Sequence, residues 1–66
     1  MLYNNLSEIL GKKKMKISTL SKKTGISRTT LTKLYYNRGC RINFSTVEKI
    51  CNQLDVTVDE LFEFKD

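Results

Sequence analysis

The feature that most restricts the fold is a single glycine, Gly25, with regularly spaced apolar residues on both sides of it. Glycine adopts the left-handed αL conformation without a Cβ penalty, and this conformation commonly ends a helix. Leu20 lies before the glycine, and Leu31 and Leu34 follow it at helical spacing. Ile26, directly after Gly25, is placed to seal the turn. The pattern predicts two short helices that cross at a fixed angle around a tight turn.

These two helices are predicted at about 17–24 and 28–36, with Ser27 as the N-cap of the second. A short helix, a glycine turn, an apolar plug, a serine cap and a second helix together indicate a helix-turn-helix over about 17–36. The outward residues of the second helix can all donate hydrogen bonds: Arg28, Thr29, Thr30, Thr32 and Lys33.

The chain before and after this pair also has helical spacing. A first helix is predicted at about 2–14, with one apolar face made of Leu2, Leu6, Ile9 and Leu10. After the pair, residues 37–41 form a basic loop with an αL position expected at Gly39. Ile42 and Phe44 are expected to anchor the exit of this loop to the core.

Two capping boxes predict two more helices. Ser45 with Glu48 opens a fourth helix at about 46–54, and Thr57 with Glu60 opens a short fifth helix that carries Leu61, Phe62 and Phe64. Strand signals are weak, so the expected fold is an all-α, compact five-helix domain with a central helix-turn-helix. The predicted core is Leu20, Ile26, Leu31, Leu34, Val47, Ile50, Leu54 and Leu61.

Length and composition exclude several classes of function. Sixty-six residues suffice for one domain, taken as 1–66, and no apolar run approaches the roughly 18 residues of a membrane span. Without a signal-peptide pattern, we expect a cytoplasmic protein. The sequence contains no histidine, so we expect no enzyme, no metal site and no cofactor, and no small-molecule ligand is indicated. Cys40 and Cys51 are expected to be reduced, Cys40 in the loop and Cys51 as a small core residue.

The charge is strongly polarised along the chain. Ten of the twelve Lys and Arg residues lie between Lys12 and Arg41, a stretch without Asp or Glu. From Glu48 onward there are six acids and two lysines. A positive half of this kind attracts polyanions, nucleic acid above all.

The residues of the predicted helix-turn-helix resemble the phage Cro/repressor-like family, also called the XRE family. The segment LSKKTGISRTTL (20–31) matches the central signature of that family, and LDVTVDEL (54–61) looks like its ending. The resemblance covers about Leu6 to Phe64. It implies a lambda-repressor-like five-helix domain that binds a double-stranded DNA operator, usually as a two-fold homodimer, and regulates transcription.

The resemblance also implies roles for particular residues. Arg28, Thr29 and Lys33 match the base-reading positions, and their side chains suit guanine edges and the thymine methyl group. Ile17 stands where many members have a phosphate-binding glutamine, so Lys16 or Ser18 is expected to take over that contact. The predicted contacts to the DNA backbone are Ser18, Lys22, Ser27, Thr30, Arg38 and Arg41.

The residues leave other readings open. Val56, Val58, Phe62 and Phe64 either form a dimer patch or complete the core of one copy. The basic surface also suits a protein-interaction module, such as an antitoxin or the partner of an antirepressor. Non-specific nucleic-acid or RNA binding would need exposed aromatic residues, for which Tyr36 and Tyr3 are the candidates.

Overall fold

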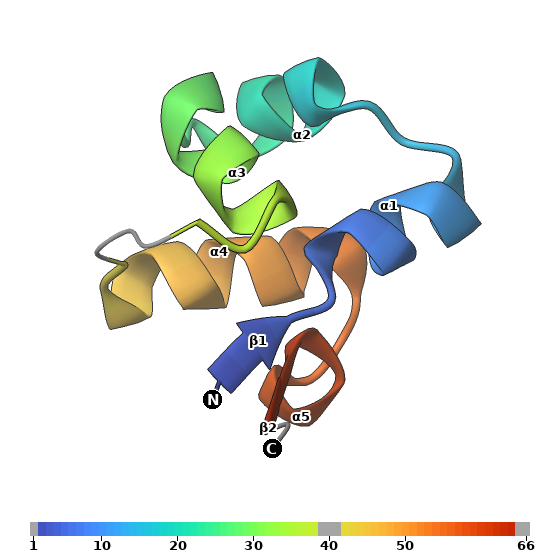
Figure 1. Ribbon diagram of the computed structural model, residues 1–66. Coiled ribbons are helices and arrows are strands. Elements are labelled where there is room, and N and C mark those ends of the chain that lie inside the picture. The colour runs from blue at the N-terminus through green and yellow to red at the C-terminus, as the bar shows by residue number, and fades with distance from the viewer. Residues whose placement is uncertain (1, 39–41, 65–66) are drawn as a thin grey trace.

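The computed structural model describes residues 2–38 and 42–64, which form five helices and a two-stranded antiparallel ribbon (Figure 1). In chain order the elements are β1 (Leu2–Asn4), α1 (Leu6–Lys13), α2 (Ile17–Thr24), α3 (Arg28–Tyr35), α4 (Phe44–Leu54), α5 (Val58–Leu61) and β2 (Phe62–Phe64). The predicted helical fold is confirmed, but all-α holds only approximately because of the ribbon.

The turn between α2 and α3 has the predicted geometry. Gly25 is the C-cap of α2 in the αL conformation, with φ of 76°, and Ser27 is the N-cap of α3. The Ser27 hydroxyl accepts a hydrogen bond from the Thr30 N–H at 3.2 Å. The Ser21 hydroxyl donates to the Ile26 carbonyl at 2.6 Å, which ties α2 to the turn. Short side chains thus satisfy backbone groups that a turn otherwise leaves open.

Helix α3 ends one residue earlier than predicted, in a Schellman motif. Asn37 adopts φ of 54°, its N–H donates to the Leu34 carbonyl at 3.0 Å, and the Arg38 N–H donates to the Lys33 carbonyl at 2.8 Å. The left-handed position was expected at Gly39, which lies outside the described residues. Asparagine tolerates this conformation better than most residues, and here it ends the helix.

The N-terminal segment differs from the predicted helix over 2–14. Leu2–Asn4 is a strand, and the helix runs only over Leu6–Lys13. The Asn4 side-chain oxygen accepts a hydrogen bond from the Leu6 N–H at 3.0 Å, as asparagine does at the start of a helix. Leu2 therefore does not share the buried face of α1, and it is 55% exposed.

The C-terminal prediction needs a matching correction. The capping box at Thr57 and Glu60 is confirmed, but the fifth helix stops at Leu61. Phe62 and Phe64 lie in β2, where they pair with Asn4 and Leu2 respectively. This pairing joins the first and last described elements of the chain, β1 and β2 (Figure 1).

The predicted capping box at Ser45 and Glu48 is wrong. Asn43 is the N-cap of α4, since its side-chain oxygen accepts from the Thr46 N–H at 2.9 Å. The helix therefore starts at Phe44, whose side chain is 94% exposed and does not anchor the loop. Ile42 does pack against the core, as expected.

The core lies between the α2–α3 pair and the helices α1 and α4, and α5 packs against α4 on the side away from α2 and α3 (Figure 1). Its buried residues are Leu6, Leu10, Leu20, Ile26, Leu31, Leu34, Ile50, Cys51, Leu54 and Leu61. Seven of the eight predicted core residues are among them, and Val47 packs at the edge. Leu20 and Leu31 are both fully buried, as the fixed crossing of α2 and α3 requires.

Candidate nucleic-acid interface

Helix α3 turns an exposed polar face away from the core. The predicted base-reading residues Arg28, Thr29 and Lys33 are all exposed. Leu31 and Leu34, on the opposite side of the same helix, are buried. Thr29 and Lys33 are four residues apart and so lie one above the other. The buried leucines therefore fix which side chains α3 offers to a partner.

The hydroxyl groups at the start of α3 are already engaged with each other. Besides accepting from the Thr30 N–H, the Ser27 hydroxyl donates to the Thr30 side-chain oxygen at 3.0 Å. Ser27 is exposed and Thr30 half-buried. Both hydroxyls can still accept a further bond or rotate toward one, but their first role is to cap the helix.

A groove of about 520 Å³ separates the start of α2 from α3. Its lining consists of Met15, Lys16, Ile17, Ser18, Arg28, Thr32, Tyr35 and Tyr36. The fold thus brings Ser18, one of the predicted backbone contacts, to the same groove as Arg28. Lys16, the other expected substitute for the family's glutamine, lines it too. Lys22 is exposed further along α2 and is not part of this groove.

Aromatic and cationic side chains cluster where α3 ends. The Tyr36 side chain is 61% exposed, and its ring meets that of Tyr35 edge-on at 5.0 Å between centroids. The guanidinium of Arg38 lies over the Tyr36 ring, 5.6 Å from the centroid. This is cation–π distance, which favours one position of the guanidinium. Arg41, another predicted backbone contact, lies outside the described residues.

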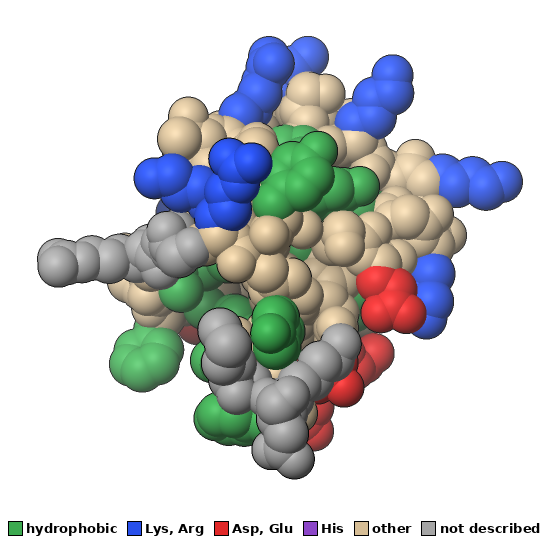
Figure 2. Space-filling model, viewed as in Figure 1, with side chains coloured by type: hydrophobic (Ala, Val, Ile, Leu, Met, Phe, Trp, Pro, Cys, Tyr) green, Lys and Arg blue, Asp and Glu red, His purple; other side chains and the backbone are tan. Residues whose placement is uncertain are grey.

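Most of the charges separate in space as they do along the sequence. Figure 2 shows basic side chains around the end of the molecule formed by α2 and α3, and acidic side chains toward the lower right. The nine basic residues between Lys12 and Arg38 are all exposed, and so are the acids from Glu48 to Glu63. The end of the molecule that carries α3 is therefore the one that attracts a polyanion.

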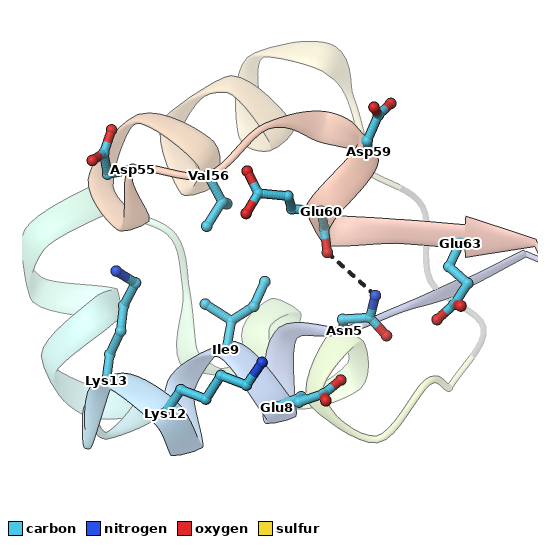
Figure 3. Close-up of a pocket in the computed structure, with 10 residues that line it drawn as sticks. All are labelled: Asn5, Glu8, Ile9, Lys12, Lys13, Asp55, Val56, Asp59, Glu60 and Glu63. Carbon is cyan, nitrogen blue, oxygen red and sulfur yellow. Dashed lines mark hydrogen bonds between the residues drawn. The ribbon is translucent and has the colours of Figure 1, made fainter.

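A second groove, of about 510 Å³, lies on another part of the surface (Figure 3). It is lined by Asn5 and by residues of α1, the α4–α5 connection, α5 and β2, and by none from α2 or α3. In Figure 3, Lys12 and Lys13 project from α1 on one side, while Asp55, Asp59 and Glu60 line the opposite side. These two lysines therefore have acidic neighbours within the molecule. They also lie in the last turn of α1, where positive charge interacts favourably with the helix dipole.

The described residues contain few groups suited to other chemistry. Burial raises the pKa of the Cys51 thiol, and the Glu60 carboxylate raises it further, which keeps this core thiol protonated. Within residues 2–38 and 42–64, no three Cys, Asp or Glu side chains are grouped to hold a metal ion. Over the same residues, each helix is too short or too polar to cross a membrane.

The fold and this surface define a helix-turn-helix protein, and comparison with known proteins gives the family. Residues 5–66 match the family model of the Cro/C1-type helix-turn-helix DNA-binding domain, so the chain belongs to that family. A curated relative is the uncharacterized HTH-type transcriptional regulator YozG of Bacillus subtilis (strain 168). It is 31% identical over 61 residues, which cover 92% of this chain and 73% of the relative.

A solved structure has the same fold. The crystal structure of a proposed DNA-binding protein from Bacteroides fragilis superimposes with a TM-score of 0.82 at 21% sequence identity. The match covers 96% of this chain and 100% of the other. At this identity the likeness supports the fold alone.

Sequence reasoning did not find the hydrogen bonds that hold the end of α3. Asn37 and Asn4 bond to each other across 33 positions of sequence, and Asn4 also bonds to α3 itself. The only local signal was the asparagine pair Asn4–Asn5 just before the first helix, a sequence typical of helix starts. Nothing in the sequence indicated which groups these asparagines would meet.

Proposed function

We propose that this protein is a sequence-specific regulator of transcription that binds a double-stranded DNA operator, with α3 in the major groove. The observation that carries the proposal is the exposed row of donor side chains on α3, at the start of a helix held by the turn that defines the family. In helix-turn-helix proteins the N-terminal residues of the second helix reach the base edges, while the first helix crosses the backbone.

In this proposal three residues read bases. Arg28 donates two hydrogen bonds to O6 and N7 of a guanine, and Lys33 donates to a guanine one turn further along α3. Thr29 offers its hydroxyl to a base edge or its methyl group to a thymine. The support is that all three side chains are exposed and that two of them sit in the first turn of the helix.

Six further residues contact the DNA backbone in this proposal: Ser18, Lys22, Ser27, Thr30, Arg38 and Arg41. Ser18 faces the groove beside Arg28, and Lys22 and Arg38 are exposed cations near α3. Contacts of this kind position the protein on the duplex and make its affinity depend on salt.

We further propose that residues 1–66 act as one domain, in the cytoplasm, as a homodimer. One α3 alone offers few base contacts, and two copies about 34 Å apart would read a near-palindrome. Of the four candidate dimer residues, Val58 and Phe64 are 57% and 82% exposed, whereas Val56 and Phe62 pack against the core. Val58 and Phe64 are therefore the stronger candidates for a contact between copies.

The test begins with selection from a random duplex pool at physiological salt, where non-specific binding is typically only about 10⁻⁴–10⁻⁶ M. Recovery of an inverted repeat with half-sites about one turn apart would support the proposal, and retention of DNA without any motif would refute sequence-specific regulation. On the selected site, Arg28→Ala should cost about 1–3 kcal/mol and relax one base position. Lys22→Ala is the control, since loss of a phosphate contact should weaken all sequences alike.

A further inference from the structure

A buried asparagine at the N-terminal end of the chain is bonded to the end of α3. Asn4 is 8% exposed. Its side-chain Nδ2 donates to the Leu34 carbonyl at 2.7 Å and to Asn37 Oδ1 at 3.1 Å, while its Oδ1 accepts from the Leu6 N–H. The Leu34 carbonyl belongs to the last turn of α3 and also accepts from the Asn37 N–H at 3.0 Å, so Asn4 supplies a second bond to it. Asn4 thereby links β1, the start of α1 and the end of α3.

Asn37 completes the link from the other side. Its Oδ1 accepts from the Asn4 main-chain N–H at 2.9 Å, and its Nδ2 donates to the Asn4 carbonyl at 3.2 Å. One carboxamide thus satisfies both main-chain groups of Asn4, as a neighbouring strand would. We call the three hydrogen bonds between Asn4 and Asn37, together with the bond from Asn4 Nδ2 to the Leu34 carbonyl, the Asn4–Asn37 lock.

The lock sits directly beside one predicted backbone contact, Arg38, and the exposed ring of Tyr36. Tyr36 precedes Asn37 and Arg38 follows it, and the Arg38 guanidinium rests over the Tyr36 ring. The Arg38 N–H is held on the Lys33 carbonyl at 2.8 Å. With Asn37 fixed on β1, the backbone that carries Arg38 has one direction relative to α3. An arginine held in advance gives up less conformational entropy when it binds a phosphate.

We propose that Asn4 and Asn37 are positioning residues for DNA binding, and that their lock aims Arg38 at a phosphate of the duplex beside the end of α3. This inference rests on the proposed function. It adds that two uncharged residues, neither of which touches DNA, determine one backbone contact.

The test is the salt dependence of DNA binding by Asn37→Gly. Glycine keeps the left-handed end of α3 and removes only the carboxamide. Each phosphate contact contributes about 0.9 to the slope of log K against log salt concentration. We expect Asn37→Gly to lower the slope by about one such contact, as Arg38→Ala does, although it removes no charge. Operator and random DNA should weaken by similar factors, because the lost contact is to the backbone.

Asn5→Ala is the matched control. It also removes a carboxamide from the N-terminal segment, but this one donates to the Glu60 carbonyl at 3.2 Å, away from α3. Its salt slope should equal that of the unaltered protein. Circular dichroism at the assay temperature establishes that each variant is folded, so a merely structural loss is distinguished from a changed contact.

A thermodynamic cycle completes the test. If the lock acts through Arg38, Asn37→Gly and Arg38→Ala together should lose little more affinity than either alone. Asn4→Ala, which removes the other side chain of the lock, should lower the salt slope by the same amount. If Asn4→Ala does not fold, the result for Asn37→Gly decides. An unchanged slope in folded Asn37→Gly, or fully additive losses, would overturn the inference while a selected operator still upheld the proposed function. Absence of any selected site would instead remove the proposed function, and the lock's role with it.

Discussion

Two exposed glycines allow one substitution, glycine to alanine, to be tested in opposite directions. Gly25 ends α2 with φ of 76°, and a Cβ added there would meet no atom within 4 Å. The cost of Gly25→Ala therefore comes from the backbone alone, about 1–2 kcal/mol for an L-residue in this conformation. Alanine also lowers the conformational entropy of the unfolded chain, which offsets about 0.4–1 kcal/mol of this cost. We expect a net loss of about 1 kcal/mol in the free energy of unfolding.

Gly11 provides the opposite case. It lies within α1, is exposed, and a Cβ added there would likewise meet nothing within 4 Å. Since glycine in a helix is less favourable than alanine, Gly11→Ala should raise the free energy of unfolding by about 0.5–1 kcal/mol. Because an added Cβ meets no atom at either site, the two substitutions differ only in the backbone conformation that alanine must adopt. The opposite signs of their effects on the free energy of unfolding therefore report that conformation.

The measurement is urea unfolding with linear extrapolation, supported by thermal melts. For a domain of this size, 1 kcal/mol corresponds to a shift in Tm of about 4–8 °C. The slope of free energy against urea should be the same in both variants, because neither changes the surface buried in the fold. A Gly25→Ala protein as stable as the parent would refute the left-handed turn, and destabilisation by Gly11→Ala would refute a regular helix at that position.

Three other changes probe the cap, the core and the thiol. Ser27→Ala should lower the free energy of unfolding by about 1 kcal/mol in urea, because α3 loses its cap, and Ser27→Asn should restore most of it. Leu31→Ala should cost about 2–5 kcal/mol, since this side chain is fully buried; a smaller loss would contradict a packed crossing. For Cys51, burial and Glu60 raise the pKa in the folded state, so the folded protein holds this proton more tightly than the unfolded chain. Its contribution to stability should then be present below about pH 8.5 and decline above it, a trend that Cys51→Ala should remove from unfolding curves at pH 7–10.

The helix-turn-helix could be predicted because its signals are local. Gly25 and Ser27 each act on backbone groups within four residues, and the spacing of Leu31 and Leu34 sets the buried face of α3 without reference to the rest of the chain. The exposed positions of Arg28 and its neighbours follow from that face. The predicted site on α3 therefore depended on the part of the fold that sequence determines best.

The ribbon could not be predicted, because each strand needs the other. Leu2 pairs with Phe64 at the far end of the chain, and neither three-residue strand has a pattern of its own. The spacing of Leu2 and Leu6 suits one face of a helix, so the sequence predicts a helix that starts too early. The start of the helix is shown by two features of the structure. Residues 2–4 pair with β2, and the Leu6 N–H donates to the Asn4 side-chain oxygen.

Competition between similar signals explains the wrong N-cap predicted for α4. Asn43 and Ser45 are both good N-caps, and the chain uses the first, whose side chain accepts bonds from both the N–H and the hydroxyl of Thr46. At the end of α3, Asn37 takes the left-handed conformation, and its side chain gains bonds to Asn4 that glycine cannot make. Gly39, where this conformation is expected from the sequence, lies outside the described residues. At Asn37, tertiary contacts thus add to the local tolerance of asparagine for this conformation.

The placement of α3 requires apolar and polar contacts together. Burial of Leu31 and Leu34 fixes which face of the helix meets the core, but the hydrophobic effect is not directional and sets the exact rotation and axial position of the helix less sharply. Hydrogen bonds are directional, and they act at both ends of α3: the Ser27 cap at the start and the bond from Asn4 to the Leu34 carbonyl at the end. Base reading requires a donor to lie within a few tenths of an ångström of its acceptor. A core this small would hold α3 in place without these bonds, but it would not aim its side chains with that accuracy.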